Sequence, residues 1–160
     1  ERVYQLKRDY PKLEIVINGG IQTVEQVAGH LEQVDGVMIG RASIGYPWIF
    51  KEIKHFMATG MHLAPPALEE RVSAARKHLE FAVEWKGEGM AIRETRRHYT
   101  NYFKNFPHFK DYRLRLVTAE TAAEVYATLA EITQVYSAEG VVLPGTNVHD
   151  VDVSAAPCDF

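Results

Sequence analysis

Two short apolar segments that each end in glycine constrain the fold of this chain more than any other feature. The first is Ile15–Gly20 (IVINGG) and the second is Val37–Arg41 (VMIGR). Both begin with strand-forming residues, and one helix-length segment lies between them. The pattern therefore predicts a strand, a helix and a second strand parallel to the first. In parallel α/β folds, the turns that follow adjacent strands lie at the same edge of the sheet, which is the edge that binds ligands.

The residues that follow the two predicted strands are suited to binding an anion. Glycine lets the backbone approach a ligand closely, so that its N–H groups can point at a phosphate. Arg41 adds a permanent charge whose geometry matches a phosphate. The alternative is that both segments are tight turns selected for their geometry, with Arg41 in a surface ion pair. The pattern alone does not decide between these two interpretations.

Periodicity predicts the other elements. Thr23 with Gln26 three residues later predicts a capping box at the start of the helix between the strands. The strands themselves, at 13–18 and 34–39, are mainly apolar without a strict alternation, and we expect them to be buried on both faces. After Pro65 and Pro66 the pattern is purely helical, which predicts a bundle. The predicted helices are 1–10, 24–31, 47–60, 68–86, 88–103 and 109–117, with a last one capped by Thr118 or Thr121.

Composition limits the classes of function. The net charge of −3 gives no global sign of a nucleic-acid partner. The single cysteine, Cys158, cannot form an intrachain disulfide, and no apolar run reaches the ~20 residues that span a bilayer. The histidines share no metal-ligand spacing with Cys or acidic residues, so we expect no metal site. Two parallel strands cannot close a sheet, so we expect the chain to be the C-terminal piece of a longer protein. We also expect that protein to be cytoplasmic and monomeric.

The segment from residue 93 to residue 115 is locally basic, with seven basic and two acidic side chains and hence a net charge of +5. Aromatic residues are interleaved with the charges. Basic side chains contact phosphates and aromatic rings stack on unpaired bases, so the segment is a candidate RNA-binding surface. The alternative is a solvated basic helix face whose aromatic residues pack inward. The basic residues are Arg93, Arg96, Arg97, Lys104, Lys110, Arg113 and Arg115.

Three runs of residues resemble the end of the catalytic barrel in tRNA-dihydrouridine synthases of the bacterial type. They are 18–21 (NGGI), 35–42 (DGVMIGRA) and 45–50 (GYPWIF). The resemblance extends over roughly residues 1 to 135 and includes Arg96–His98, which matches the Arg-Lys-His motif of the family's RNA-binding domain. Here the middle residue is arginine, which preserves the charge.

The resemblance implies an α/β plus all-α protein. Residues 1–60 would be the last two βα units of an incomplete TIM (β/α)8 barrel. Residues 61–66 would be a linker and 67–137 a helical tRNA-binding domain, and we expect 138–160 to be a disordered acidic tail. The implied reaction is the reduction of uridine to 5,6-dihydrouridine in tRNA, with FMN as cofactor and NADPH as its reductant.

The resemblance also implies the site residues. The FMN phosphate would bind at Asn18, Gly19, Gly20, Gly40 and Arg41, with Asn18 beside the flavin. RNA would bind at Arg93, Arg96, Arg97, His98 and Lys104. The family's catalytic cysteine belongs to a part of the barrel that this chain lacks, and Cys158 does not match it, so we expect no catalytic residue here. The alternatives are another FMN barrel oxidoreductase that acts on a small molecule, and a non-catalytic RNA-binding module.

Overall fold

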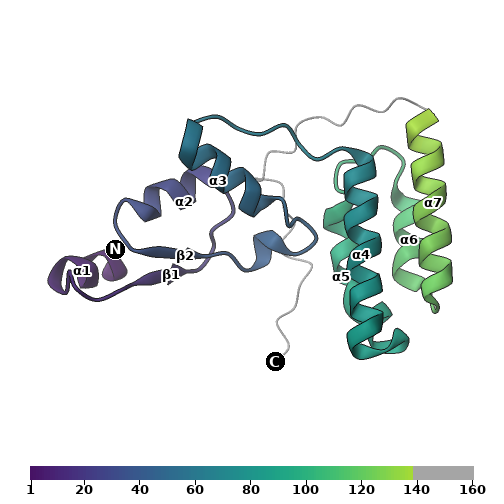
Figure 1. Cartoon of the computed structure of the whole chain (residues 1–160), viewed down its shortest axis with the longest axis horizontal. Helices are drawn as coiled ribbons and strands as arrows, with labels where there is room; N and C mark the ends of the chain where they lie inside the picture. The colour runs from purple at the N-terminus through teal and green to yellow at the C-terminus, as the bar shows by residue number, and fades with distance from the viewer. Residues whose placement is uncertain (139–160) are drawn as a thin grey trace. The chain divides into compact units, whose positions relative to one another are not determined.

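The computed structural model describes residues 1–138 of the chain, which divide into two compact units (Figure 1). The first unit extends from Glu1 to Leu63, and the second begins at Ala64. Of the predicted tail, only Ala138 is described, and it is the last residue of a helix. The rest of that prediction, with Cys158, lies outside the described residues.

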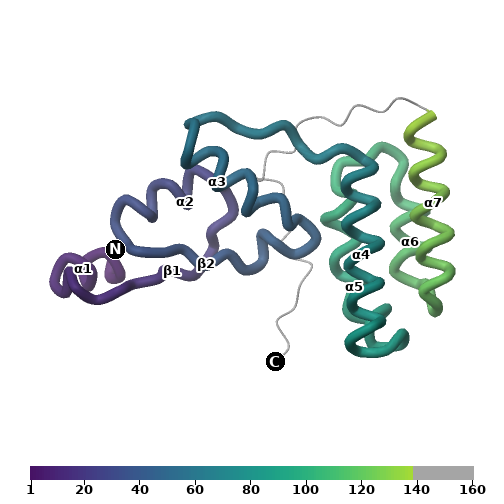
Figure 2. Tube along the Cα trace, in the orientation of Figure 1, coloured from purple at the N-terminus to yellow at the C-terminus, as the bar shows by residue number. Residues whose placement is uncertain are grey.

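The first unit contains a strand–helix–strand crossover, which Figure 2 traces along the backbone. Its two strands pair in parallel, with Val16 opposite Gly36 and Asn18 opposite Met38. The parallel arrangement predicted from the sequence is therefore confirmed, although each strand is shorter than predicted. The elements are α1 (Arg2–Asp9), β1 (Val16–Asn18), α2 (Val24–Leu31), β2 (Gly36–Met38), the 3-10 helix η1 (Arg41–Ser43) and α3 (Ile49–Thr59).

The strands are less buried than the sequence predicts. Ile15 and Val34, just before the strands, are buried, but the side chains of Val16 and Met38 are 58% and 54% exposed. The prediction of burial on both faces is therefore wrong for this structure. Among residues 1–138 the sheet has only two strands, and no closed barrel is present. Each strand thus has a single neighbour, and part of the sheet surface has no covering layer.

Both ends of the crossover are fixed by side chains. At the start of α2, the backbone N–H of Gln26 donates to Thr23 Oγ1, and Gln26 Oε1 accepts from the backbone N–H of Thr23, both at 3.2 Å. This confirms the predicted capping box. Before β2, the Asp35 carboxylate accepts from Lys7 Nζ at 2.7 Å and from the backbone N–H of Ile15 at 2.8 Å. The hydrogen bond from Lys7 contributes most to lowering the pKa of Asp35, and it joins α1 to the sheet.

The second unit consists of four helices in the described part of the chain. Helix α4 packs against α5 and α7, and α6 packs against the same two helices, so the four surround a common core. Thr121 rather than Thr118 begins the last helix, because Thr121 Oγ1 accepts from the backbone N–H of Glu124 at 3.2 Å. The helices are α4 (Leu68–Lys86), α5 (Glu88–Tyr102), α6 (Lys110–Thr118) and α7 (Ala122–Ala138).

A buried arginine holds one end of this core together. Arg71, in the first turn of α4, has no exposed surface. Its Nε donates to the carbonyl oxygen of Pro66 at 3.0 Å, and its Nη1 donates to that of Tyr102 at 3.1 Å. The guanidinium also lies 5.7 Å from the ring centroid of Phe106. Arg71 thus connects the segment before α4 to the C-terminal end of α5, where a positive charge is favourable.

The connection between α5 and α6 is irregular, but its three phenylalanine side chains are buried. Phe103 and Phe109 stack with ring centroids 4.9 Å apart, and Phe106 packs edge-on against Tyr136 of α7 at 5.4 Å. The Tyr136 hydroxyl donates to the carbonyl of Pro107 at 2.6 Å. Two non-glycine residues of this connection, Asn105 and His108, have left-handed backbones with φ of 65° and 55°. The ring cluster therefore stabilises a backbone conformation that costs free energy locally.

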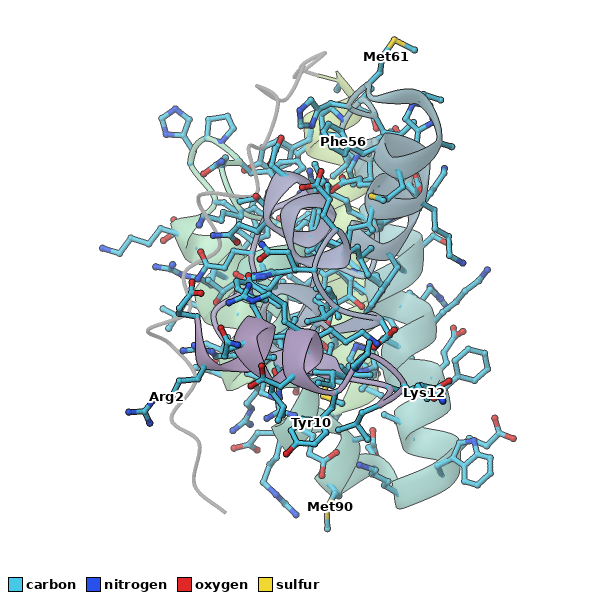
Figure 3. All side chains as sticks on the ribbon, turned by 90° about the vertical axis from the view of Figure 1, so that its left-hand side faces the viewer. Arg2, Tyr10, Lys12, Phe56, Met61 and Met90 are labelled. Atoms are coloured by element: carbon cyan, nitrogen blue, oxygen red, sulfur yellow. The ribbon has the colours of Figure 1, made fainter. Side chains whose placement is uncertain are left out.

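Some large apolar side chains lie at the surface of both units. Met61 of the first unit and Met90 of the second extend away from the ribbon (Figure 3) and are 62% and 47% exposed. None of the helices within residues 1–138 is both long enough and apolar enough to cross a membrane.

Candidate functional site

The two glycine turns lie at one edge of the sheet. Because β1 and β2 are parallel and Asn18 is opposite Met38, the residues that follow the strands leave the sheet in the same direction. Gly19 and Gly20 follow the first strand, and Gly40 follows the second after one intervening residue. This is the edge at which parallel α/β proteins bind ligands.

The backbone at this edge is accessible to a ligand. Gly19 and Gly20 have positive φ values of 135° and 64°, which side-chain-bearing residues rarely adopt. A Cβ atom placed on Gly19, Gly20 or Gly40 would meet no other atom within 4 Å. These positions therefore leave open space on the side where a side chain would lie, so a ligand can approach the backbone closely there.

The charge at the edge comes from Arg41, the first residue of η1. Its side chain is exposed, and among residues 1–138 it forms no ion pair with a carboxylate. The surface ion pair that we considered for Arg41 from the sequence is therefore absent among these residues. The turn itself is closed by Ser43, whose N–H and hydroxyl both donate to the carbonyl of Gly40, at 3.0 and 2.8 Å.

A second group of candidate residues lies on α5. Arg93 and Arg97 are exposed and one helical turn apart, and Lys104 follows two residues after the helix ends. In the part of the chain that the structure describes, none of these three cations forms an ion pair. We call Arg93, Arg97 and Lys104 the basic stripe. Arg93 and Arg97 are at helical spacing, and cations so placed can contact successive phosphates of a nucleic acid.

Arg96 is not part of this stripe. Its side chain is half-buried, and its Nη2 donates to the carbonyl oxygen of Ala119, at the end of α6, at 2.9 Å. Its Nε is buried and forms no hydrogen bond within the described residues. Arg96 thus places its charge at the C-terminal end of α6, where it stabilises the helix. Likewise Arg115 forms an ion pair with Glu131 at 2.7 Å.

His98 lies between the basic stripe and the core. Its ring packs edge-to-face against that of His78 of α4, with centroids 4.5 Å apart, and its Nε2 accepts from Arg97 Nε at 3.4 Å. Burial, together with the nearby His78 and Arg97, lowers the pKa of His98 to about 4. The imidazole is therefore neutral at neutral pH, when one ring nitrogen can accept a hydrogen bond.

The aromatic residues of the basic segment pack inward. Tyr99, Tyr102 and Phe103 are all buried, so their faces are not available for stacking on bases. Burial also raises the pKa of Tyr102 to about 12. The inward-packing alternative considered from the sequence is correct for these three rings. Any affinity of this surface for RNA therefore depends on charge and not on stacking through these residues.

Sequence reasoning missed two residues of α4, Arg71 and His78. The signal was their spacing: both lie three or four residues from Ala75, on the face that packs against α5. A polar residue at a core position of a helix is buried and needs partners. Within residues 1–138, no group of three or more His, Cys, Asp or Glu side chains is arranged to hold a metal ion.

Comparisons with known proteins show the family of this chain. Residues 1–137 match the family described as Dihydrouridine synthase (Dus). The chain is 38% identical over 112 residues to tRNA-dihydrouridine synthase B of Xanthomonas axonopodis pv. citri, a match that covers 69% of the chain and 34% of that protein. It is 34% identical over 134 residues to tRNA-dihydrouridine(20/20a) synthase of Haemophilus ducreyi, covering 84% and 40%. The chain thus spans about a third of the length of the curated relatives it matches. It belongs to the dihydrouridine synthase family.

Proposed function

We propose that this chain takes part in the FMN-dependent reduction of uridine to 5,6-dihydrouridine in tRNA. The first unit would bind the phosphate of FMN, and the second unit would bind tRNA. The observation that carries the proposal is the pair of open glycine turns at one edge of a parallel sheet, in a chain of this family. A phosphate fits there because the edge combines accessible backbone N–H groups with the exposed charge of Arg41.

Five residues would hold the FMN phosphate. Gly19, Gly20 and Gly40 leave space beside their backbone, and Asn18 and Arg41 flank them in the chain. The guanidinium of Arg41 would neutralise the phosphate charge, and the Asn18 side chain would lie beside the flavin. When bound, FMN supplies hydride transfer to the uracil ring, with NADPH as the proposed reductant. We assign no proton donor among residues 1–138.

The first unit would be part of a TIM barrel, the fold of this family. The exposed apolar side chains of Val16 and Met38 support this, because further strands and helices would bury them. The barrel assignment would also explain why two mainly apolar strands have exposed side chains here. The helical unit would follow the barrel as a separate RNA-binding domain.

The basic stripe would bind the phosphates of tRNA. Arg93 and Arg97 are about 6 Å apart along the helix axis, at 1.5 Å per residue. Neither has a competing carboxylate partner in the described part of the chain. Glu94, which lies between them in the sequence, pairs with Lys86 at 2.5 Å, so its charge is neutralised locally. The stripe is therefore a positive surface in a protein whose net charge is −3.

The salt dependence of tRNA binding tests this proposal. Each phosphate contact that is lost reduces the slope of log K against log salt by ~0.7–0.9. We expect Arg93→Ala with Arg97→Ala to reduce the slope by roughly 1.5. Arg115→Ala is the matched control, because Arg115 belongs to the same basic segment but pairs with Glu131. Equal slopes for the parent and the double variant would show that the stripe does not contact RNA.

A further inference from the structure

We infer that His78 and His98 are positioning residues that orient the guanidinium of Arg97 toward an RNA phosphate. The inference rests on the proposed function, because it assigns a supporting layer to the basic stripe. His78 does not belong to the Arg96–His98 motif and lies on a different helix. It would therefore be a further determinant of the RNA-binding surface, one that acts through His98 and does not itself contact RNA.

Four side chains form a continuous series from the core to the surface. The Tyr102 hydroxyl lies 3.3 Å from His78 Nδ1. The His78 ring then meets the His98 ring at 87°, with centroids 4.5 Å apart. His98 Nε2 in turn accepts from Arg97 Nε at 3.4 Å. Tyr102 is buried and Arg97 is exposed, so these contacts connect the surface charge to the core.

The contact from Arg97 requires a neutral His98. Only an unprotonated Nε2 has a lone pair that can accept from Arg97 Nε, so the proton of the neutral ring is on Nδ1. Burial, His78 and Arg97 all lower the pKa of His98, and Glu94 alone raises it. Burial, Arg97 and Lys86 lower the pKa of His78 in the same way. The groups of α4 and α5 around the pair therefore keep both rings neutral.

Fixing Nε leaves the two terminal NH2 groups of Arg97 free to bind outside the protein. These two groups form the fork that matches two oxygens of a phosphate. A guanidinium already held in one orientation loses less side-chain entropy when it binds. We expect the positioning to improve tRNA affinity by about 2- to 10-fold, which is less than a strong hydrogen bond from a charged group would give, because the 3.4 Å contact is long and lies near the surface.

The test compares two replacements of His98 and one of His78, in the parent protein and in an Arg97→Ala background. His98→Gln places an amide oxygen near the position of Nε2 and should retain most of the tRNA affinity, whereas His98→Leu keeps a similar volume without an acceptor. We expect His98→Leu and His78→Ala each to weaken tRNA binding by about 2- to 10-fold. In an Arg97→Ala background, neither replacement should weaken it further, because the side chain that they position is gone. Fluorescence anisotropy with labelled tRNA measures the parent and every variant.

The outcomes separate this inference from the proposed function. If Arg97→Ala leaves affinity and salt slope unchanged, the proposed RNA-binding stripe is wrong, and the inference fails with it. If Arg97→Ala weakens binding but His98→Leu costs the same in both backgrounds, only the inference is overturned. The parent protein gives a check that needs no variant. In ¹⁵N NMR at pH 7, His98 should be protonated at Nδ1 and not at Nε2, and a proton on Nε2 would also overturn the inference.

Discussion

Replacing Arg71 should destabilise the helical unit more than replacing any exposed arginine. Arg71→Met keeps most of the side-chain volume but removes both hydrogen bonds, to the carbonyls of Pro66 and Tyr102. A hydrogen bond from a charged group contributes about 1.5–3 kcal/mol, and both carbonyls would lose a partner. We therefore expect the free energy of unfolding to fall by about 3–5 kcal/mol.

The matched control is Arg76→Met in the same helix. Arg76 is exposed, with an ion pair to Glu80 at 2.9 Å and a contact with the ring of Tyr126. Surface pairs of this kind contribute about 0–1 kcal/mol. Urea unfolding followed by circular dichroism at 222 nm measures both variants, because the signal is dominated by helix. Arg71→Met and Arg76→Met with equal midpoints would refute the view that Arg71 holds the core together.

Three more results are expected. First, the pKa of His98 is about 4 in the folded state, below the ordinary histidine pKa of 6.5. The contribution of neutral His98 to the free energy of unfolding is therefore fully present above pH 6.5 and is lost as the pH decreases toward 4. The two pKa values differ by about 2.5, which limits the loss of unfolding free energy to ~3.4 kcal/mol. Because the ring is partly exposed, we expect a loss of ~1–2 kcal/mol. A His98→Gln variant that loses as much stability over the same pH range would contradict this prediction. Second, Gly20→Val and Arg41→Ala should weaken FMN binding by ~10-fold or more while leaving riboflavin, which lacks the phosphate, unaffected. Equal effects on both ligands in fluorescence titrations would place the phosphate elsewhere. Third, a fragment of residues 64–138 should unfold cooperatively by circular dichroism, whereas residues 1–63 alone should aggregate, because their apolar strands are exposed; a monomeric, folded 1–63 fragment would count against the barrel assignment.

Local signals in the sequence were sufficient to predict most of the elements. The capping box at Thr23 and the left-handed Gly60 at the end of α3 each place a helix end where the sequence predicts it. Such signals act over a few residues and do not depend on the rest of the fold. The burial of the strands was not predictable in the same way, because it depends on the elements that cover them.

The candidate site also has features that local sequence signals predict and others that depend on the rest of the fold. The sequence predicts a run of positive charge between residues 93 and 115, but it does not show which cations are engaged within the fold. Arg96 binds a carbonyl of another helix, and Arg115 binds Glu131, so neither is as available to RNA as Arg97. These partners lie 16 to 23 residues away in the sequence, beyond the range of any local pattern. The role of His78 beside His98 depends on the packing of α4 on α5 and was missed for the same reason.

The irregular connection between α5 and α6 has a consequence for local opening of the backbone. The backbone N–H of Phe103 donates to the carbonyl of Tyr99 and that of Phe106 donates to the carbonyl of Phe103, at 3.2 and 3.4 Å. The ring of Phe103 packs edge-on against Phe106 and stacks on Phe109. Opening this segment would expose several rings to water, at a cost close to that of opening the whole helical unit. These amides should therefore exchange with deuterium as slowly as those in the middle of α5. Although residues 103–109 lack regular secondary structure, insertions there should be tolerated as poorly as insertions within a helix.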